Sequence, residues 1–231
     1  ALSIDLPSNQ LTEAAIGFNF RGSSAKKAYI LVEDYPVEFD NAYYFVLAPS
    51  GKLNITEITN NNNSPLQRLF SNEPFFQATR YSAGNIDYST MGASDLIILQ
   101  GLDEIPAALV STVSEYVNSG GNLVIIPGPS GQSAGYAALL QSLSIPASYT
   151  SSSNSSPKTG LLVPDRNNPF FRSIFSAHDA KMQMPAAVRS LIWSRASEDI
   201  LKFRGGAPFL SRFDRGPGQV YLMAASLNAG Q

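Results

Sequence analysis

The sequence contains no cysteine and only one histidine, His178. Without thiols the chain has no disulfide framework, no thiolate metal site and no cysteine nucleophile. A single histidine, with carboxylates scattered along the chain, gives no set of metal ligands at recognisable spacing. We therefore expect neither a metal nor a cofactor.

Charged residues are also scarce, at 15% of the chain, and the formal net charge is −2. The 16 Lys and Arg residues form no basic stripe that would release counterions from a nucleic acid, so DNA or RNA is not an expected partner. The longest apolar runs, such as 96–99 and 123–126, are far shorter than the roughly 20 residues that span a bilayer. We expect this part of the chain not to be inserted in a membrane.

Hydrophobic residues make up 44% of the sequence, which is typical of a globular protein. Residues 1–48 contain short segments in which apolar and polar residues alternate, at 2–6, 16–20, 28–32 and 42–47. Period-two alternation predicts three or four antiparallel strands in this region.

The pattern changes from Lys52 onward. Residues 95–100 and 123–126 are continuous apolar runs of the kind found in strands buried on both faces, and each is followed by a segment with helical spacing, at 105–118 and 133–143. An earlier strand at 53–58 precedes Ser64-Pro65, an expected helix start. This order predicts an α/β fold of the flavodoxin-like, doubly wound class, with a parallel sheet covered on both faces.

The second half of the chain has different features. A polar loop at 148–157 precedes β-like segments at 191–193, 200–203, 208–213 and 219–225, and residues 214–218 predict a hairpin turn between the last two. We expect these segments to add antiparallel strands to the sheet. The aromatic groups at 43–45, 75–76 and 170–171 are expected to lie mainly in the core, with a ligand groove as the alternative.

The turn Gly128-Pro129-Ser130-Gly131-Gln132 lies between a predicted strand and a predicted helix, where a nucleophile elbow would hold its serine. Ser130 is the candidate nucleophile, and its base would have to be His178. Nothing in the sequence places His178 near Ser130. A hydrolase that uses Ser130 with His178 is therefore an alternative interpretation.

The same turn could instead bind a small anion, because backbone N–H groups of Ser130, Gly131 and Gln132 would lie at a helix N-terminus. No lysine or recognised phosphate-binding motif accompanies them. Small residues, including Gly128, are equally needed to turn the chain tightly between a strand and a helix. The residues favour this third interpretation, a connection without chemistry.

Several segments resemble the extracytoplasmic region of BatA-like membrane proteins of Bacteroidetes, which belong to the aerotolerance-regulator group. The resemblance rests on DYPVEFDNAYYF at 34–45, SDLIIL at 94–99, GGNLVIIP at 120–127, NPFF at 168–171 and GPGQVYL at 216–222. It implies that residues 1–48 end an immunoglobulin-like β domain and that residues 49–231 form a class I glutamine amidotransferase-like domain.

Active members of the amidotransferase class carry a cysteine nucleophile at the elbow, and a histidine and a carboxylate later in the chain. Here Ser130 stands at about the cysteine's place, and His178-Asp179-Ala180 does not reproduce the expected histidine and carboxylate pair. The resemblance therefore implies a degenerate amidotransferase-like domain, a pseudoenzyme.

The function expected from the sequence is a non-catalytic binding or assembly module of a larger cell-envelope protein, and not an enzyme. Its expected partners are envelope proteins, with glycans as a further possibility. The resemblance implies a periplasmic location and a membrane-anchored parent, with a cytoplasmic location as the alternative. Because the chain starts at Ala1, without an initiator methionine, we expect a segment of a longer protein.

Overall fold

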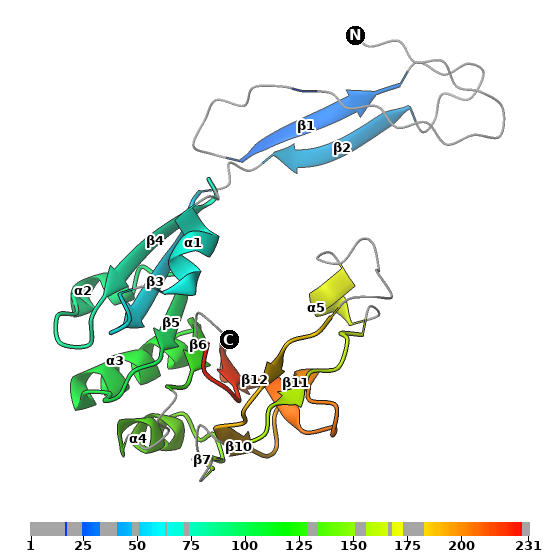
Figure 1. Cartoon of the computed structure of the whole chain (residues 1–231). Coiled ribbons are helices and arrows are strands. Elements are labelled where there is room, and N and C mark those ends of the chain that lie inside the picture. Colours follow the sequence, from blue (N-terminus) through cyan, green and yellow to red (C-terminus); the bar gives the residue numbers. More distant parts are fainter. Residues whose placement is uncertain are drawn as a thin grey trace. The chain divides into compact units, whose positions relative to one another are not determined.

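The structure is a computed structural model of the whole chain, shown in Figure 1. It describes residues 17, 25–32, 41–47, 51–62, 64–71, 74–128, 134–150, 156–165, 168–172 and 183–227. The chain divides into two compact units, Ala1–Gly51 and Lys52–Gln231.

The first unit contains an antiparallel hairpin of β1 (Lys26–Leu31) and β2 (Ala42–Leu47). The strands expected at 2–6 and 16–20 lie outside the described residues, apart from Gly17. The expectation that the aromatic residues of β2 are core residues is wrong for Tyr43 and Tyr44, which are 69% and 74% exposed. Among the described residues of this unit no second layer packs on the ribbon, and most of its side chains are exposed.

The second unit is built on a seven-stranded mixed sheet with the strand order β11-β12-β13-β6-β5-β3-β4. Five of its strands run parallel: β3 (Leu53–Thr59), β4 (Phe76–Tyr81), β5 (Leu96–Gln100), β6 (Asn122–Ile126) and β13 (Gly218–Met223). The other two, β11 (Glu198–Lys202) and β12 (Pro208–Arg215), extend it antiparallel beyond β13. The predicted α/β class and the antiparallel additions are confirmed.

Helices lie on both faces of this sheet. Leu66 and Phe70 of α1 (Pro65–Ser71) pack on the face that carries Ile55, Ile98 and Ile126. The larger core on the opposite face receives α2 (Tyr88–Met91), α3 (Ala107–Asn118) and α4 (Ala134–Ser142). Successive side chains of each central strand therefore point in turn into one core and then the other. This is why the sequences of β5 and β6 are apolar without interruption.

Short elements complete the unit. The two-stranded sheets pair β7 (Ala147–Tyr149) with β10 (Leu191–Trp193) and β8 (Thr159–Gly160) with β9 (Ala186–Ala187), and α5 is Pro169–Arg172. Within the described ranges, no helix combines the length and apolar character needed to cross a membrane.

Five elements were not predicted from the sequence: α2, the edge strand β4 and the short strands β7, β8 and β9. Strand β7 overlaps the start of the polar loop expected at 148–157, which is a correction to that expectation. The segment FQATRY of β4 mixes polar and apolar residues, and most of its side chains are exposed or only partly buried because it closes the sheet on one side. Of the aromatic groups, Phe171 is buried as expected, whereas Phe75 is 61% exposed and Phe170 is 41% exposed, contrary to expectation.

Candidate functional site

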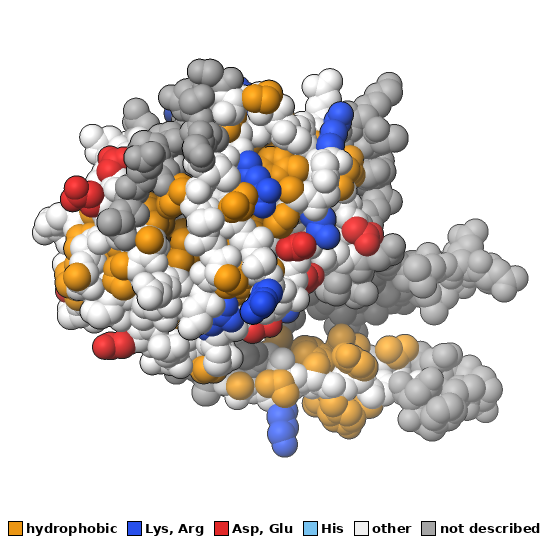
Figure 2. Space-filling view, turned by 90° about the horizontal axis from the view of Figure 1, so that it is seen from below, with side chains coloured by type: hydrophobic (Ala, Val, Ile, Leu, Met, Phe, Trp, Pro, Cys, Tyr) orange, Lys and Arg blue, Asp and Glu red, His pale blue; other side chains and the backbone are white. Residues whose placement is uncertain are grey.

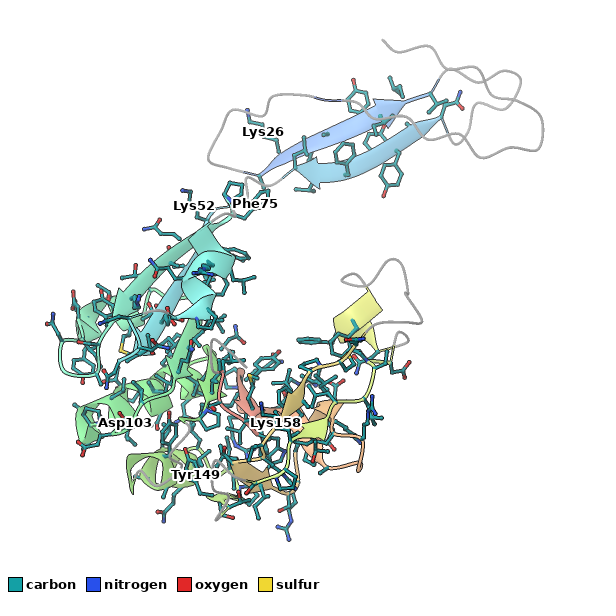
Figure 3. All side chains as sticks on the ribbon, in the orientation of Figure 1. Lys26, Lys52, Phe75, Asp103, Tyr149 and Lys158 are labelled. Carbon is teal, nitrogen blue, oxygen red and sulfur yellow. The ribbon has the colours of Figure 1, made fainter. Side chains whose placement is uncertain are left out.

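The carboxyl ends of β3, β5 and β6 lie side by side at one edge of the sheet. After β3 the chain forms α1 on one face of the sheet, and after β5 it forms α3 on the other face. The two connections use opposite faces because β4 lies on one side of β3 and β5 lies on the other. Open α/β sheets commonly bind their ligands at the carboxyl edge where the strand order reverses in this way. Lys52 and Phe75 mark the opposite, amino edge, and Asp103 lies beyond β5 (Figure 3).

Three polar side chains are buried together at this carboxyl edge: Glu57 of β3, Gln100 at the end of β5, and Ser64 just before α1. They are 4%, 2% and 3% exposed, respectively. Glu57 and Gln100 project from the face of the sheet that α1 covers, in step with the buried Ile55 and Ile98 two residues earlier on each strand. We call these three residues the edge cluster.

Ser64 is the centre of the edge cluster. Its hydroxyl donates a hydrogen bond to Oε1 of Glu57 and accepts one from the backbone N–H of Leu66, at 3.2 Å, in the first turn of α1. Oγ of Ser64 also lies 3.0 Å from Oε1 of Gln100. The hydroxyl of Ser64 has a single proton, which goes to Glu57. Toward Gln100 the hydroxyl oxygen can therefore only accept, so the amide of Gln100 must be turned with its nitrogen facing Ser64.

Few groups near Glu57 can compensate the negative charge of its carboxylate. Within the described residues, no Lys or Arg nitrogen lies within 4.0 Å of its carboxylate, since the ion pairs found there involve Asp199, Glu198 and Asp214. Arg80 is its register partner on β4. The Arg80 guanidinium instead donates to the carbonyl of Asn62 and to Oε1 of Gln67, both at 3.1 Å. The carboxylate of Glu57 is thus buried without an ion pair, and the cation of its register partner is engaged elsewhere.

A second buried hydrogen bond connects α4 to the segment that follows β5. The hydroxyl of Tyr136 in α4 accepts a hydrogen bond from the backbone N–H of Leu102 at 3.1 Å. Burial raises the pKa of Tyr136; the Leu102 hydrogen bond opposes this shift, and the charge of Asp103 adds to it. A Cβ on Gly135 would lie 2.7 Å from the backbone of Ile105, so only glycine allows this approach of α4 to the chain beyond β5.

Of the site residues predicted from the sequence, the structure describes only Gly128. It is buried directly after β6, and a Cβ there would lie 3.4 Å from the carbonyl oxygen of Leu102. Gly128 therefore lies on the same sheet edge as the edge cluster. Ser130, Gly131, Gln132 and His178 lie outside the described residues, so the hydrolase and anion-binding interpretations remain predictions.

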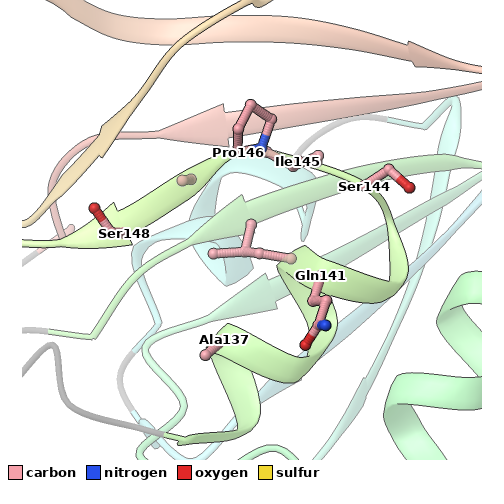
Figure 4. A pocket seen from close by; sticks show the side chains of 8 residues that line it. Ala137, Gln141, Ser144, Ile145, Pro146 and Ser148 are labelled. Carbon is pink, nitrogen blue, oxygen red and sulfur yellow. The ribbon is translucent and has the colours of Figure 1, made fainter.

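A hollow of about 450 Å³ lies between α4 and β7 (Figure 4). It is lined by Ala137, Leu140, Gln141, Ser144, Ile145, Pro146, Ala147 and Ser148. None of these side chains carries a charge, and the polar ones are Gln141, Ser144 and Ser148.

The described part of the chain contains no group of three His, Asp or Glu side chains placed to hold a metal ion. Acidic and basic side chains are scattered over the face of the molecule in Figure 2 and do not gather into a patch of one sign.

The edge cluster was missed in the sequence because its members lie at positions 57, 64 and 100, in no recognised motif. A signal was nevertheless present. Glu57 and Gln100 are polar residues near the ends of two predicted parallel strands, and the ends of such strands meet at one edge. Ser64 was predicted as a helix cap, and the structure gives it this position together with its contact to Glu57.

No protein-family model matches the sequence, and no curated protein matches it. Solved structures match the fold. The β-galactosidase of Rahnella sp. R3 aligns with 77% of this chain at 14% identity and a TM-score of 0.52, over 29% of the enzyme. The β-galactosidase of Bacillus circulans sp. alkalophilus aligns with 77% of this chain at 12% identity and a TM-score of 0.48, over 29% of the enzyme.

A cytoplasmic protein of Salmonella typhimurium aligns over more of its length. It matches 88% of this chain and 85% of its own chain, at 10% identity and a TM-score of 0.50. By contrast, this chain spans less than a third of the glycosidases that it resembles.

The expectation that the chain is not an enzyme is wrong. It rested on the absence of cysteine and the single histidine, which exclude thiol chemistry and any site that needs two histidines, and leave other enzyme chemistry open. The likeness to the Rahnella β-galactosidase places this fold within an enzyme. At 14% identity the likeness establishes the fold alone.

Proposed function

We propose that this chain is a binding and assembly module of a larger cell-envelope protein, and that it binds its partner at the carboxyl edge of β3 and β5. The observation that carries the proposal is the buried carboxylate of Glu57 at this edge, held by Ser64 and not neutralised by an ion pair within the described residues. Burying such a group is costly unless its hydrogen-bonding capacity is used.

The finer fold assignment is part of the proposal. We assign residues 49–231 to a flavodoxin-like, class I glutamine amidotransferase-like domain, and residues 1–48 to the end of an immunoglobulin-like domain. The order of the parallel strands and the helices on both faces support the first assignment. The resemblance to BatA-like proteins supports the second assignment, a periplasmic location and a membrane-anchored parent.

Cross-linking from the two edges of the sheet tests the proposal. Because the chain has no cysteine, a single introduced thiol can carry a benzophenone maleimide. Asn62→Cys places the label in the exposed loop after β3, and Ala93→Cys places it at an exposed position beside the start of β5, at the amino edge. Each labelled chain is illuminated in an envelope extract, and the adducts are identified by mass spectrometry.

We expect a partner that is cross-linked from Asn62→Cys and not from Ala93→Cys. Equal adducts from both positions, adducts from Ala93→Cys alone, or no adducts would contradict binding at the carboxyl edge.

A further inference from the structure

We infer that the edge cluster binds a neutral ligand with several hydroxyl groups, of the saccharide class, and that Glu57 accepts hydrogen bonds from those hydroxyls. This inference names the ligand class of the edge site and therefore rests on the proposed function.

The first step concerns unused hydrogen-bonding capacity. An ionised carboxylate has about four acceptor positions. Within the described residues, the side chain of Glu57 receives a single hydrogen bond, from Ser64, although it is only 4% exposed. A buried carboxylate with one donor calls for further donors.

The second step concerns the charge of the ligand. An anion placed beside Glu57 would meet a like charge in a region shielded from water, and a like charge in such surroundings is repelled strongly. A cation would meet Arg80, the register partner of Glu57 on β4, whose guanidinium is fixed by Asn62 and Gln67. A neutral ligand avoids both conflicts.

The third step concerns the type of neutral group. With its amide nitrogen donating to Ser64, Gln100 retains an acceptor oxygen and a second N–H donor next to the carboxylate. A hydroxyl group both donates and accepts. Neighbouring hydroxyls of a sugar ring would therefore satisfy Glu57 as donors and Gln100 as donors or acceptors, whereas a single amine or a carbonyl would satisfy only one of the two side chains.

Isothermal titration calorimetry with defined probes tests the inference. The probes are neutral tetrasaccharides of glucose, galactose and N-acetylglucosamine, and the tetramer of galacturonic acid as the anionic counterpart of the galactose chain. The proteins are the unaltered chain, Glu57→Gln and Glu115→Gln. Glu115 lies exposed on α3, so its variant makes the same change of charge away from the edge cluster.

We expect at least one neutral tetrasaccharide to bind, the galacturonic acid tetramer not to bind, and Glu57→Gln to weaken binding about tenfold or more, because hydrogen bonds to a charged acceptor are the stronger ones. Glu115→Gln should bind like the unaltered chain. Absence of binding by every neutral probe, equal binding by Glu57→Gln, or equal binding of the anionic tetramer would overturn the inference.

Amide hydrogen exchange of the unaltered chain with the bound tetrasaccharide gives a test that does not depend on the folding of Glu57→Gln. Protection of residues 57–66 and 100–102 is expected, and protection confined to other segments overturns the inference. If the inference fails while Asn62→Cys still cross-links an envelope protein, the ligand class is wrong and the proposed function stands. If Asn62→Cys cross-links nothing, the proposed function fails as well.

Discussion

The hydroxyl of Ser64 donates a hydrogen bond to the carboxylate of Glu57, and both side chains are buried at the carboxyl edge of the sheet. This contact joins the cap of α1 to the strand β3, so it has a structural role as well as the binding role proposed above. The two roles make different predictions for substitutions at positions 57 and 64.

Replacing Ser64 with alanine should destabilise the fold. The change removes a helix cap, worth about 1 kcal/mol, and leaves the buried carboxylate of Glu57 without its donor, at about 1–3 kcal/mol. Urea denaturation should report the sum, about 2–4 kcal/mol. In the variant Glu57→Gln/Ser64→Ala the second contribution should shrink, because the uncompensated charge is gone.

The matched control is Ser111→Ala, an exposed serine on α3 whose hydroxyl donates to the carbonyl of Ala108. Its effect should stay within about 0.5 kcal/mol. Equal losses of stability for Ser64→Ala and Ser111→Ala would show that the edge cluster contributes no more than a surface contact.

Replacing Gly135 with alanine should also destabilise the fold, although alanine favours helix. The new methyl group would lie 2.7 Å from the backbone N and O of Ile105, and such overpacking costs about 1–3 kcal/mol. Gly92→Ala is the control, because a Cβ there meets nothing within 4 Å and φ is −65°. We expect Gly92→Ala to be neutral or to raise the unfolding temperature, and a Gly135→Ala protein as stable as Gly92→Ala would refute the close approach.

The rings of Tyr136 and Tyr149 pack edge to face, with centroids 5.7 Å apart, and the two residues should respond in opposite ways to loss of the hydroxyl group. Tyr136→Phe leaves the N–H of Leu102 without its acceptor and should cost about 1–3 kcal/mol. The Tyr149 hydroxyl is buried with no hydrogen-bond partner within the described residues, so Tyr149→Phe should be neutral or stabilising by up to about 1 kcal/mol. Denaturant titrations of both variants decide this, and a large loss for Tyr149→Phe would contradict it.

The same two tyrosines predict a loss of stability at alkaline pH. Burial raises the pKa of both phenols above the ordinary value of 10.0. Above about pH 10 the unfolded chain releases these protons while the folded chain retains them, so the free energy of unfolding falls as pH rises and is unaffected by these groups below that pH. Denaturation midpoints measured across this range should fall less steeply in Tyr136→Phe and Tyr149→Phe, and unchanged slopes would argue against the burial of both hydroxyls.

Much of the second unit could be predicted from local sequence patterns. The apolar runs of β5 and β6 and the helical spacing of Leu109, Val113 and Val117 reflect burial, which the sequence records directly. The edge strand β4 was missed because a strand at the side of a sheet has partly exposed residues and a weaker pattern. The exposure of Tyr43 and Tyr44 was missed because local pattern does not tell which strands receive a second layer.

The candidate site was harder to predict than the fold. The turn at Gly128–Gln132 stands out in the sequence because glycine and serine after a strand match known motifs, and only its first residue lies in the described part of the chain. Glu57 and Gln100 are 43 positions apart in the printed sequence, and both reach Ser64 only because β3 and β5 are neighbours. This arrangement depends on strand order, which local patterns do not specify.

Hydrogen exchange with and without envelope extract tests the central claim most directly, because it compares both edges of the sheet in one unaltered protein. If the carboxyl edge is the binding site, the extract should slow exchange in residues 57–66 and 100–102 and leave residues 51–54 and 93–96, at the amino edge, unchanged. Slowed exchange at the amino edge alone, or no change at either edge, would contradict the claim.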